Sequence, residues 1–233
     1  EFLPDVPGTY QLTVTDLGSS KPVAFPVIAG LWRGVIVGQD AKGRPTVDTA
    51  CTGCHAVGTA LDQFTPWAQS GHAEIFTQNV NTPNGHYGTS CLSCHTVGYN
   101  TAVNNNGIDD QPDWTAFLAS NLLTHGDPTN WTNILAQFPK TAKLANIQCE
   151  NCHGPNDGTG LHGNKQLDPA RISISSDVCG SCHGEPARHG RFQQWEESGH
   201  ANFKPAIDDA TVETRGATAA HCGRCHTGKG LPA

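Results

Sequence analysis

The sequence predicts a fold of mainly short α-helices and irregular loops, with a small β-rich N-terminal segment and an interior filled by prosthetic groups. Three observations support this fold class. Among 233 residues, 26 are Gly and 15 are Pro, so much of the backbone must form turns and loops. Only 36% of the residues are hydrophobic, and this share includes 10 Cys, which leaves few side chains for an ordinary core. The chain also contains 12 His and no Met, a composition that indicates bound cofactors.

The first 48 residues form the expected β-rich segment. They contain neither Cys nor His, and polar and apolar residues alternate from Tyr10 onward, as in a strand. Further strands are expected over residues 23–28 and 31–37, separated by Gly, Pro and Ser turns. Too few strands remain for a complete sandwich. We therefore expect residues 1–48 to form an arm that packs on the rest of the chain or on another molecule.

Residues 49–233 form the expected cofactor-binding domain. A helix is predicted over residues 65–79, because Pro66 suits a first helical turn. Shorter helices are predicted over residues 113–123, 129–138 and 140–147.

Charge and hydropathy exclude two classes of partner. No window approaches the run of about 18 apolar residues that a membrane-spanning helix needs, and residues 1–5 lack the basic and apolar regions of a signal peptide. With 21 acidic and 14 basic residues, a net charge of −7 and no extended basic cluster, the chain has no electropositive footprint for nucleic acid. We expect neither a membrane span nor a nucleic-acid partner.

The cysteines fall into five pairs with the spacing Cys-x-x-Cys, and a histidine directly follows every pair. Cys-x-x-Cys-His is the attachment motif of c-type haem. The attachment cysteines are Cys51 and Cys54, Cys91 and Cys94, Cys149 and Cys152, Cys179 and Cys182, and Cys222 and Cys225, and the histidines that follow are His55, His95, His153, His183 and His226.

The spacing suits haem attachment physically. Two thiols about one helical turn apart can add to the two vinyl groups of one porphyrin, and the next residue then offers its imidazole to the iron as proximal ligand. Zinc ribbons use such pairs two at a time and would leave one pair over, thioredoxin-like pairs occur near a βαβ pattern, and disulfide frameworks do not keep identical short spacings. The sequence therefore predicts five covalently attached haem c groups, and a core built around them.

An internal repeat accompanies the motifs. Eleven residues after the first motif comes Trp67-Ala-Gln-Ser-Gly-His72-Ala, and eleven residues after the fourth comes Trp195-Glu-Glu-Ser-Gly-His200-Ala, at a constant offset of 128 residues. The second and fifth motifs both continue as Cys-x-x-Cys-His-Thr. We interpret residues 49–177 and 178–233 as two copies of one haem-binding unit.

These motifs resemble the multihaem c-type cytochromes, and in particular the superfamily of tetrahaem cytochromes and hydroxylamine oxidoreductase. The run Cys149-Glu-Asn-Cys-His-Gly-Pro, followed by His162, is similar to another pattern of that group. The resemblance implies closely packed haems with histidine on both faces of most irons. The family contains both electron carriers and enzymes, so the resemblance alone does not choose between them.

Seven histidines remain as candidate distal ligands. Because the chain has no Met, bis-histidine ligation of low-spin haems is the default, and low reduction potentials follow. A surface or propionate-contacting imidazole is an open alternative for His86 and His125, and also for His221. The expected distal ligands are His72, His200, His162, His189 and His221.

The sequence favours an electron carrier without catalytic residues. All five motifs end in His, whereas pentahaem nitrite reductases carry a Lys at one of these positions, and the few tyrosines, Tyr87 and Tyr99 among them, suit packing beside a haem. The alternative is a multihaem oxidoreductase that acts on a small nitrogen or sulfur compound at one open haem.

Location and partners follow from the haem chemistry. Thioether attachment takes place outside the cytoplasm, so we expect an extracellular or periplasmic protein with redox proteins or extracellular electron acceptors as partners. The second copy has no counterpart of the third motif before Ala233, so either the chain is a piece of a longer protein or its last haem meets another subunit. Extracellular cytochrome filaments are similar in their ligation and sparse secondary structure, which makes a conductive homopolymer a further hypothesis.

Overall fold

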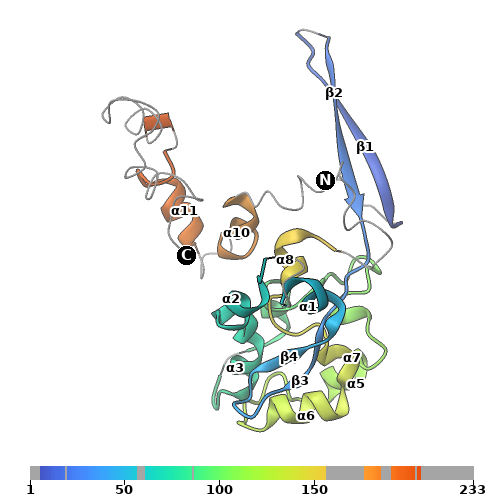
Figure 1. The fold of residues 1–233 in the computed structure, drawn as a ribbon, viewed down its shortest axis with the longest axis vertical. Helices are drawn as coiled ribbons and strands as arrows, with labels where there is room; N and C mark the ends of the chain where they lie inside the picture. The colour runs from blue at the N-terminus through green and yellow to red at the C-terminus, as the bar shows by residue number, and fades with distance from the viewer. Residues whose placement is uncertain are drawn as a thin grey trace. The chain divides into compact units, whose positions relative to one another are not determined.

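The structure is a computed structural model, and it divides into two units, Glu1–Ile174 and Ser175–Ala233. Figure 1 shows the ribbon with its helices and strands labelled. The structure describes residues 6–18, 20–56, 61–85, 87–155, 176–184, 190–202 and 204–205.

The first two strands form a regular hairpin. β1 (Gly8–Thr15) and β2 (Pro22–Ala29) pair antiparallel from Gly8↔Ala29 to Thr15↔Pro22, as the long ribbon in Figure 1 shows. The alternation predicted a strand from Tyr10 and another over 23–28, and both are confirmed. The register places Leu12 opposite Phe25 on one apolar face, and these side chains are 38% and 50% exposed.

A second, smaller sheet pairs β3 (Ile36–Gln39) with β4 (Pro45–Val47). The strand predicted over 31–37 is wrong, because β3 begins only at Ile36. The preceding backbone N–H groups find side-chain partners instead of a strand. The N–H of Arg33 donates to Glu150 Oε2 at 2.6 Å and that of Val35 donates to Gln148 Oε1 at 2.9 Å.

The helices are short, and none in the described part exceeds eight residues, so their stability depends on packing rather than on length. The single helix predicted over residues 65–79 is wrong, because Ser70 has extended backbone angles and interrupts it. The elements of the first unit are α1 (Thr49–His55), α2 (Phe64–Ala68), η1 (Gly71–Ala73), α3 (Ile75–Asn81), η2 (Thr89–Cys91), α4 (Leu92–His95), η3 (Ile108–Asp110), α5 (Trp114–Ala119), α6 (Asn130–Gln137), α7 (Pro139–Ala142) and α8 (Cys149–His153).

Three of these elements match predictions from the sequence in place but not in extent. α5 and α6 lie within the helices predicted over 113–123 and 129–138, α7 begins at Pro139 and overlaps the helix predicted over 140–147, and each is shorter than expected. In the second unit, the described helices are α10 (Ser176–His183) and α11 (Arg191–Glu196).

The fold class expected from the sequence, a mainly α and irregular chain with a haem core, is wrong. The described chain is a mixture of short helices and two small antiparallel sheets, and side chains of the first unit form its core. Whole-chain composition does not reveal this core, because its members are separated in the sequence, from Ile36 to Ala145, and come together only in the folded chain. The main core cluster contains Ile36, Phe76, Val80, Tyr87, Leu92, Phe117, Leu123, Trp131, Ile134, Phe138, Ala142 and Ala145.

Aromatic rings interlock within this core. Phe76 meets Trp131 edge to face, with 6.2 Å between ring centroids, and Phe117 meets Phe138 in the same way at 5.7 Å. Such offset and edge contacts add to the stabilisation from burial alone.

A buried polar side chain fixes the backbone beside the core. Asn146 is fully buried in the left-handed conformation, with φ of 64°. Its Oδ1 accepts the N–H groups of Phe76 at 2.8 Å and Thr77 at 3.2 Å, and its Nδ2 donates to Thr77 Oγ1 at 2.9 Å. Asn tolerates positive φ better than most residues. Asn therefore suits this position both for its backbone conformation and for the hydrogen bonds of its side chain.

Replacement of Asn146 tests this role. Asn146→Ala leaves two buried N–H groups without their acceptor, and we expect a loss of about 3 kcal/mol in the free energy of unfolding, measured by denaturant titration. Asn121→Ala is the matched control, because Asn121 also has positive φ, 61°, but is exposed. Its expected loss is about 1 kcal/mol. Equal losses in the two variants would show that the buried bonds contribute nothing.

Gly126 provides a second test of packing. A Cβ at this position would overlap the backbone carbonyl of Thr82, which cannot move as freely as a side chain. We expect Gly126→Ala to lower the free energy of unfolding by about 1–3 kcal/mol through overpacking. Gly8→Ala, where a Cβ meets nothing within 4 Å, is the control and leaves thermal unfolding unchanged. An unchanged melting temperature in Gly126→Ala would contradict the close approach.

Candidate functional site

The four Cys-x-x-Cys-His motifs in the described part share one local structure. The first, third and fourth lie in the helices α1, α8 and α10, whereas the second runs from Cys91, the last residue of η2, through α4. In all four the helix ends at the histidine of the motif: His55, His95, His153 and His183. Helical backbone places the two cysteines of a pair about one turn apart. The spacing that the sequence requires for thioether attachment is therefore present in the backbone of all four.

The second motif is anchored in the core. Leu92, between its two cysteines, is fully buried, while Cys91, Cys94 and His95 are half-buried. The next residue, Thr96, is also fully buried and donates its hydroxyl to Leu92 O at 2.6 Å. The cysteines thus project from a helical turn whose other face is fixed to the protein interior.

His95 of this motif has a defined neighbour, Tyr87. The Tyr87 hydroxyl lies 3.2 Å from His95 Nδ1, and the two rings are stacked, with centroids 5.5 Å apart and planes 20° apart. Tyr87 is 7% exposed. Burial, and then the neighbouring Cys91 and Cys94, raise the pKa of the Tyr87 hydroxyl, so the phenol stays neutral.

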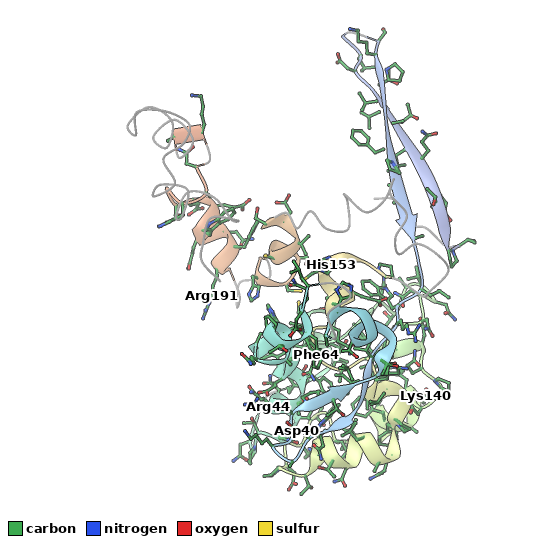
Figure 2. The ribbon with its side chains drawn as sticks, in the orientation of Figure 1. Asp40, Arg44, Phe64, Lys140, His153 and Arg191 are labelled. Atoms are coloured by element: carbon green, nitrogen blue, oxygen red, sulfur yellow. The ribbon has the colours of Figure 1, made fainter. Side chains whose placement is uncertain are left out.

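The third motif is more exposed than the second. Cys149, Cys152 and His153 are exposed, and Figure 2 labels His153 at the end of α8. Glu150, between the cysteines, is buried and accepts the Arg33 N–H. Thiols and imidazole therefore face outward, while the intervening carboxylate ties the helix to the chain before β3.

A direct hydrogen bond joins the second and third motifs. Asn151, inside the third motif, donates from Nδ2 to Thr96 O at 2.9 Å, directly after His95. An isolated bridge between Thr96 and Ala145 and the bond from Val97 N–H to Leu144 O, 2.9 Å, support the same contact. The two motifs belong to one fixed block of the first unit.

The first and fourth motifs are held by different contacts. Thr52 in the first donates its hydroxyl to Asp48 O at 3.0 Å, and the carbonyl of His55 accepts the Gln63 N–H at 3.0 Å. In the fourth, Gly180 lies against the ring of Phe192 from α11, and a Cβ there would clash with the ring. Cys179 is exposed and Cys182 is half-buried.

The two tryptophan segments share their local structure as well as their sequence. In one, Ser70 Oγ donates to Trp67 O at 2.7 Å, and in the other Ser198 Oγ donates to Trp195 O at 2.6 Å. The backbone bonds Ala73 N–H to Ser70 O and Ala201 N–H to Ser198 O are both 3.2 Å.

The sequence analysis missed one further member of each segment. Phe64 packs on Trp67 with centroids 5.6 Å apart, and Phe192 packs on Trp195 at 5.4 Å; Figure 2 labels Phe64 in α2. Phe64 and Phe192 stand at the same 128-residue offset as the other shared residues. Extending the comparison of the chain with itself by three residues would have found them.

The predicted distal ligands that the structure describes are accessible. His72 and His200 are exposed, and each follows the tryptophan turn. The carbonyl of His72 accepts the Ile147 N–H at 3.0 Å, and Trp67 Nε1 donates to Ile147 O at 2.8 Å. The backbone of His72 is therefore hydrogen-bonded to Ile147, which stands two residues before Cys149, the first cysteine of the third motif.

Of the other candidate distal ligands, the structure describes His125. His125 is exposed, and its Nδ1 lies 3.1 Å from Thr124 Oγ1. The side chains of Cys51 and Cys54 are not described, although α1 is. Wholly outside the described residues lie His86, His162, His189, His221, Cys222, Cys225 and His226.

The donor set fits c-type haem. The six cysteines described with their side chains carry thiols and not disulfides, and helical turns set their spacing. At His95, Nδ1 contacts Tyr87, so Nε2 would be the nitrogen offered to an iron, the usual arrangement of an imidazole ligand. Within the described ranges, no three His, Cys, Asp or Glu side chains come together as a ready-made metal cluster.

Neither a membrane-spanning helix nor a known relative accompanies the site within the described residues and the comparisons made. Among the described helices, none has both the length and the apolar character needed to cross a membrane. No family model, curated protein or solved structure matches this chain.

Proposed function

We propose that the protein is a pentahaem c-type cytochrome that carries electrons. The observation that supports this proposal most directly is the shared structure of the motifs: each described Cys-x-x-Cys-His run is a helical turn that ends at its histidine. Five such motifs occur in the sequence, so five haems per chain follow.

The chain's own residues then have simple roles. The paired thiols would form thioether bonds to haem, and the histidine that closes each motif would offer its Nε2 to the iron. When bound, haem supplies a one-electron couple between ferric and ferrous iron. The side-chain core of the first unit lies around Phe76 and Trp131. The motif helices would hold the haems next to this core, against which Cys91 already packs.

Exposed histidines outside the motifs suit the sixth position on each iron. His72 and His200 lie in equivalent turns after Trp67 and Trp195, and both side chains reach solvent. In a chain without Met, their imidazoles are the natural distal ligands and favour low potentials. Closed, six-coordinate irons suit an electron carrier and leave no position for substrate.

Compartment and partners follow from the same proposal. Covalent haem attachment places the mature protein in the periplasm or outside the cell, and its partners are redox proteins or extracellular acceptors. Haem propionates make the loaded protein more acidic than the −7 of the polypeptide, so a basic surface on the partner would favour encounter. Association into a conductive homopolymer stays a prediction.

Haem stoichiometry tests the proposal. Intact-mass measurement of the exported full chain is expected to show five covalent haems, and Cys149→Ala/Cys152→Ala is expected to show four, because both thiols of one exposed attachment site are gone. Ser181→Ala, which removes one hydroxyl between the cysteines of the fourth motif, is the control and keeps five. A wild-type chain without covalent haem would overturn the proposal.

Carbon monoxide distinguishes a carrier from an enzyme. The reduced wild-type protein is expected to keep its Soret band under carbon monoxide, because the proposal gives every iron two histidine ligands. His72→Ala should open one haem and shift a single component of the band, whereas Gln69→Ala, an exposed change in the same segment, should not. A shift in the wild-type protein would instead indicate an open haem and favour the oxidoreductase alternative.

A further inference from the structure

Tyr87 and His95 form a defined contact at a motif histidine. Two independent features connect them: a hydroxyl-to-Nδ1 distance of 3.2 Å and a stacked pair of rings. Tyr87 stands four residues before Cys91, so the contact lies within one local segment. The attachment motif by itself requires no tyrosine, and the attachment of haem does not explain this pair.

We propose that Tyr87 is a positioning residue for His95, whose hydroxyl accepts a hydrogen bond from Nδ1–H, keeps Nε2 for iron and lowers the potential of the haem at Cys91 and Cys94. This inference rests on the proposed haem attachment. It adds a side chain that regulates one particular haem among the five.

The direction of the hydrogen bond follows from the ligation. A neutral imidazole that gives Nε2 to iron carries its proton on Nδ1, so Nδ1 donates and the tyrosine oxygen accepts. An acceptor at Nδ1–H makes the imidazole a stronger electron donor. Stronger donation stabilises ferric iron relative to ferrous iron, and the reduction potential falls.

The surroundings hold Tyr87 in place. Its ring meets Phe76 edge to face, with centroids 5.7 Å apart, and Phe76 is fully buried. Phe76 in turn packs against Trp131 in the main core cluster. A hydroxyl on such a fixed ring keeps its position while the iron changes oxidation state, which is the property that a positioning group needs.

A second histidine shows the contrast. The Thr124 hydroxyl lies 3.1 Å from His125 Nδ1, a similar distance, but both residues are exposed. Water competes for such a contact and the side chains rotate, so the ring is not held in one orientation. The distinctive feature of Tyr87 is therefore a buried, stacked acceptor and not merely a nearby hydroxyl.

Tyr87→Phe and Tyr99→Phe in the full, haem-loaded chain test the inference as a matched pair. Both variants remove one hydroxyl from a tyrosine that packs in or against the same core cluster, and Tyr99 faces Trp114 at 6.0 Å between centroids. In Tyr87→Phe we expect five retained haems, a higher midpoint potential for one haem, and an altered low-spin electron paramagnetic resonance signal for one haem. Tyr99→Phe is expected to match the wild type.

The outcomes separate the inference from the proposed function. If the wild-type chain carries no haem at Cys91 and Cys94 by peptide mass analysis, the proposed function fails first. If that haem is present but Tyr87→Phe has the potentials and signals of Tyr99→Phe, the positioning role is overturned while the cytochrome proposal stands. Loss of the haem from Tyr87→Phe alone would assign Tyr87 a structural role and would also overturn the inference.

Discussion

Buried hydrogen bonds of Asn146 and Gln148 hold the first unit together. Asn146 binds the backbone where α3 begins, at Phe76 and Thr77, and Gln148 accepts the Val35 N–H ahead of β3 while donating to Lys143 O and Ala145 O. An apolar side chain at either position would leave backbone groups unsatisfied in the interior, at a cost that hydrophobic packing does not repay. The helices and the small sheet therefore meet along this short polar segment.

The same segment leads directly into the third motif and explains how the exposed cysteines of that motif are held in place at the surface. Residues of one helical turn alternate in role: Glu150 and Asn151 face inward and bond to Arg33 N–H and Thr96 O, while Cys149 and Cys152 face outward. Polar anchoring thus supplies the rigidity that short helices lack. The proposed electron transfer would benefit from such rigidity, because little structural rearrangement would accompany each change of charge.

Local patterns in the sequence predicted local structure well, and average composition predicted the core poorly. Alternation found β1 and β2, and motif spacing found the helical turns around Cys91 and Cys149. The core was missed because a low overall share of apolar residues says nothing about their clustering. The beginning of β3 and the break at Ser70 depend on distant partners or on backbone angles that no short window contains. The pairing of Tyr87 with His95 likewise depends on the packing of Phe76.

The hairpin restricts how copies of this chain could associate. The bond from Asp16 N–H to Lys21 O identifies these two residues as a hydrogen-bonded pair, and in an antiparallel ladder such pairs alternate with pairs that exchange no hydrogen bonds. By this alternation, Thr15↔Pro22 and Gln11↔Pro26 are pairs without hydrogen bonds. Both proline nitrogens therefore face away from β1. The outer edge of β2 therefore lacks donors at two positions and is a poor template for another strand, whereas the edge of β1 is complete. Two ribbons could join through their β1 strands, but the resulting four-stranded sheet would then end in proline-bearing edges on both sides. Strand addition to this hairpin therefore joins at most two copies of the chain.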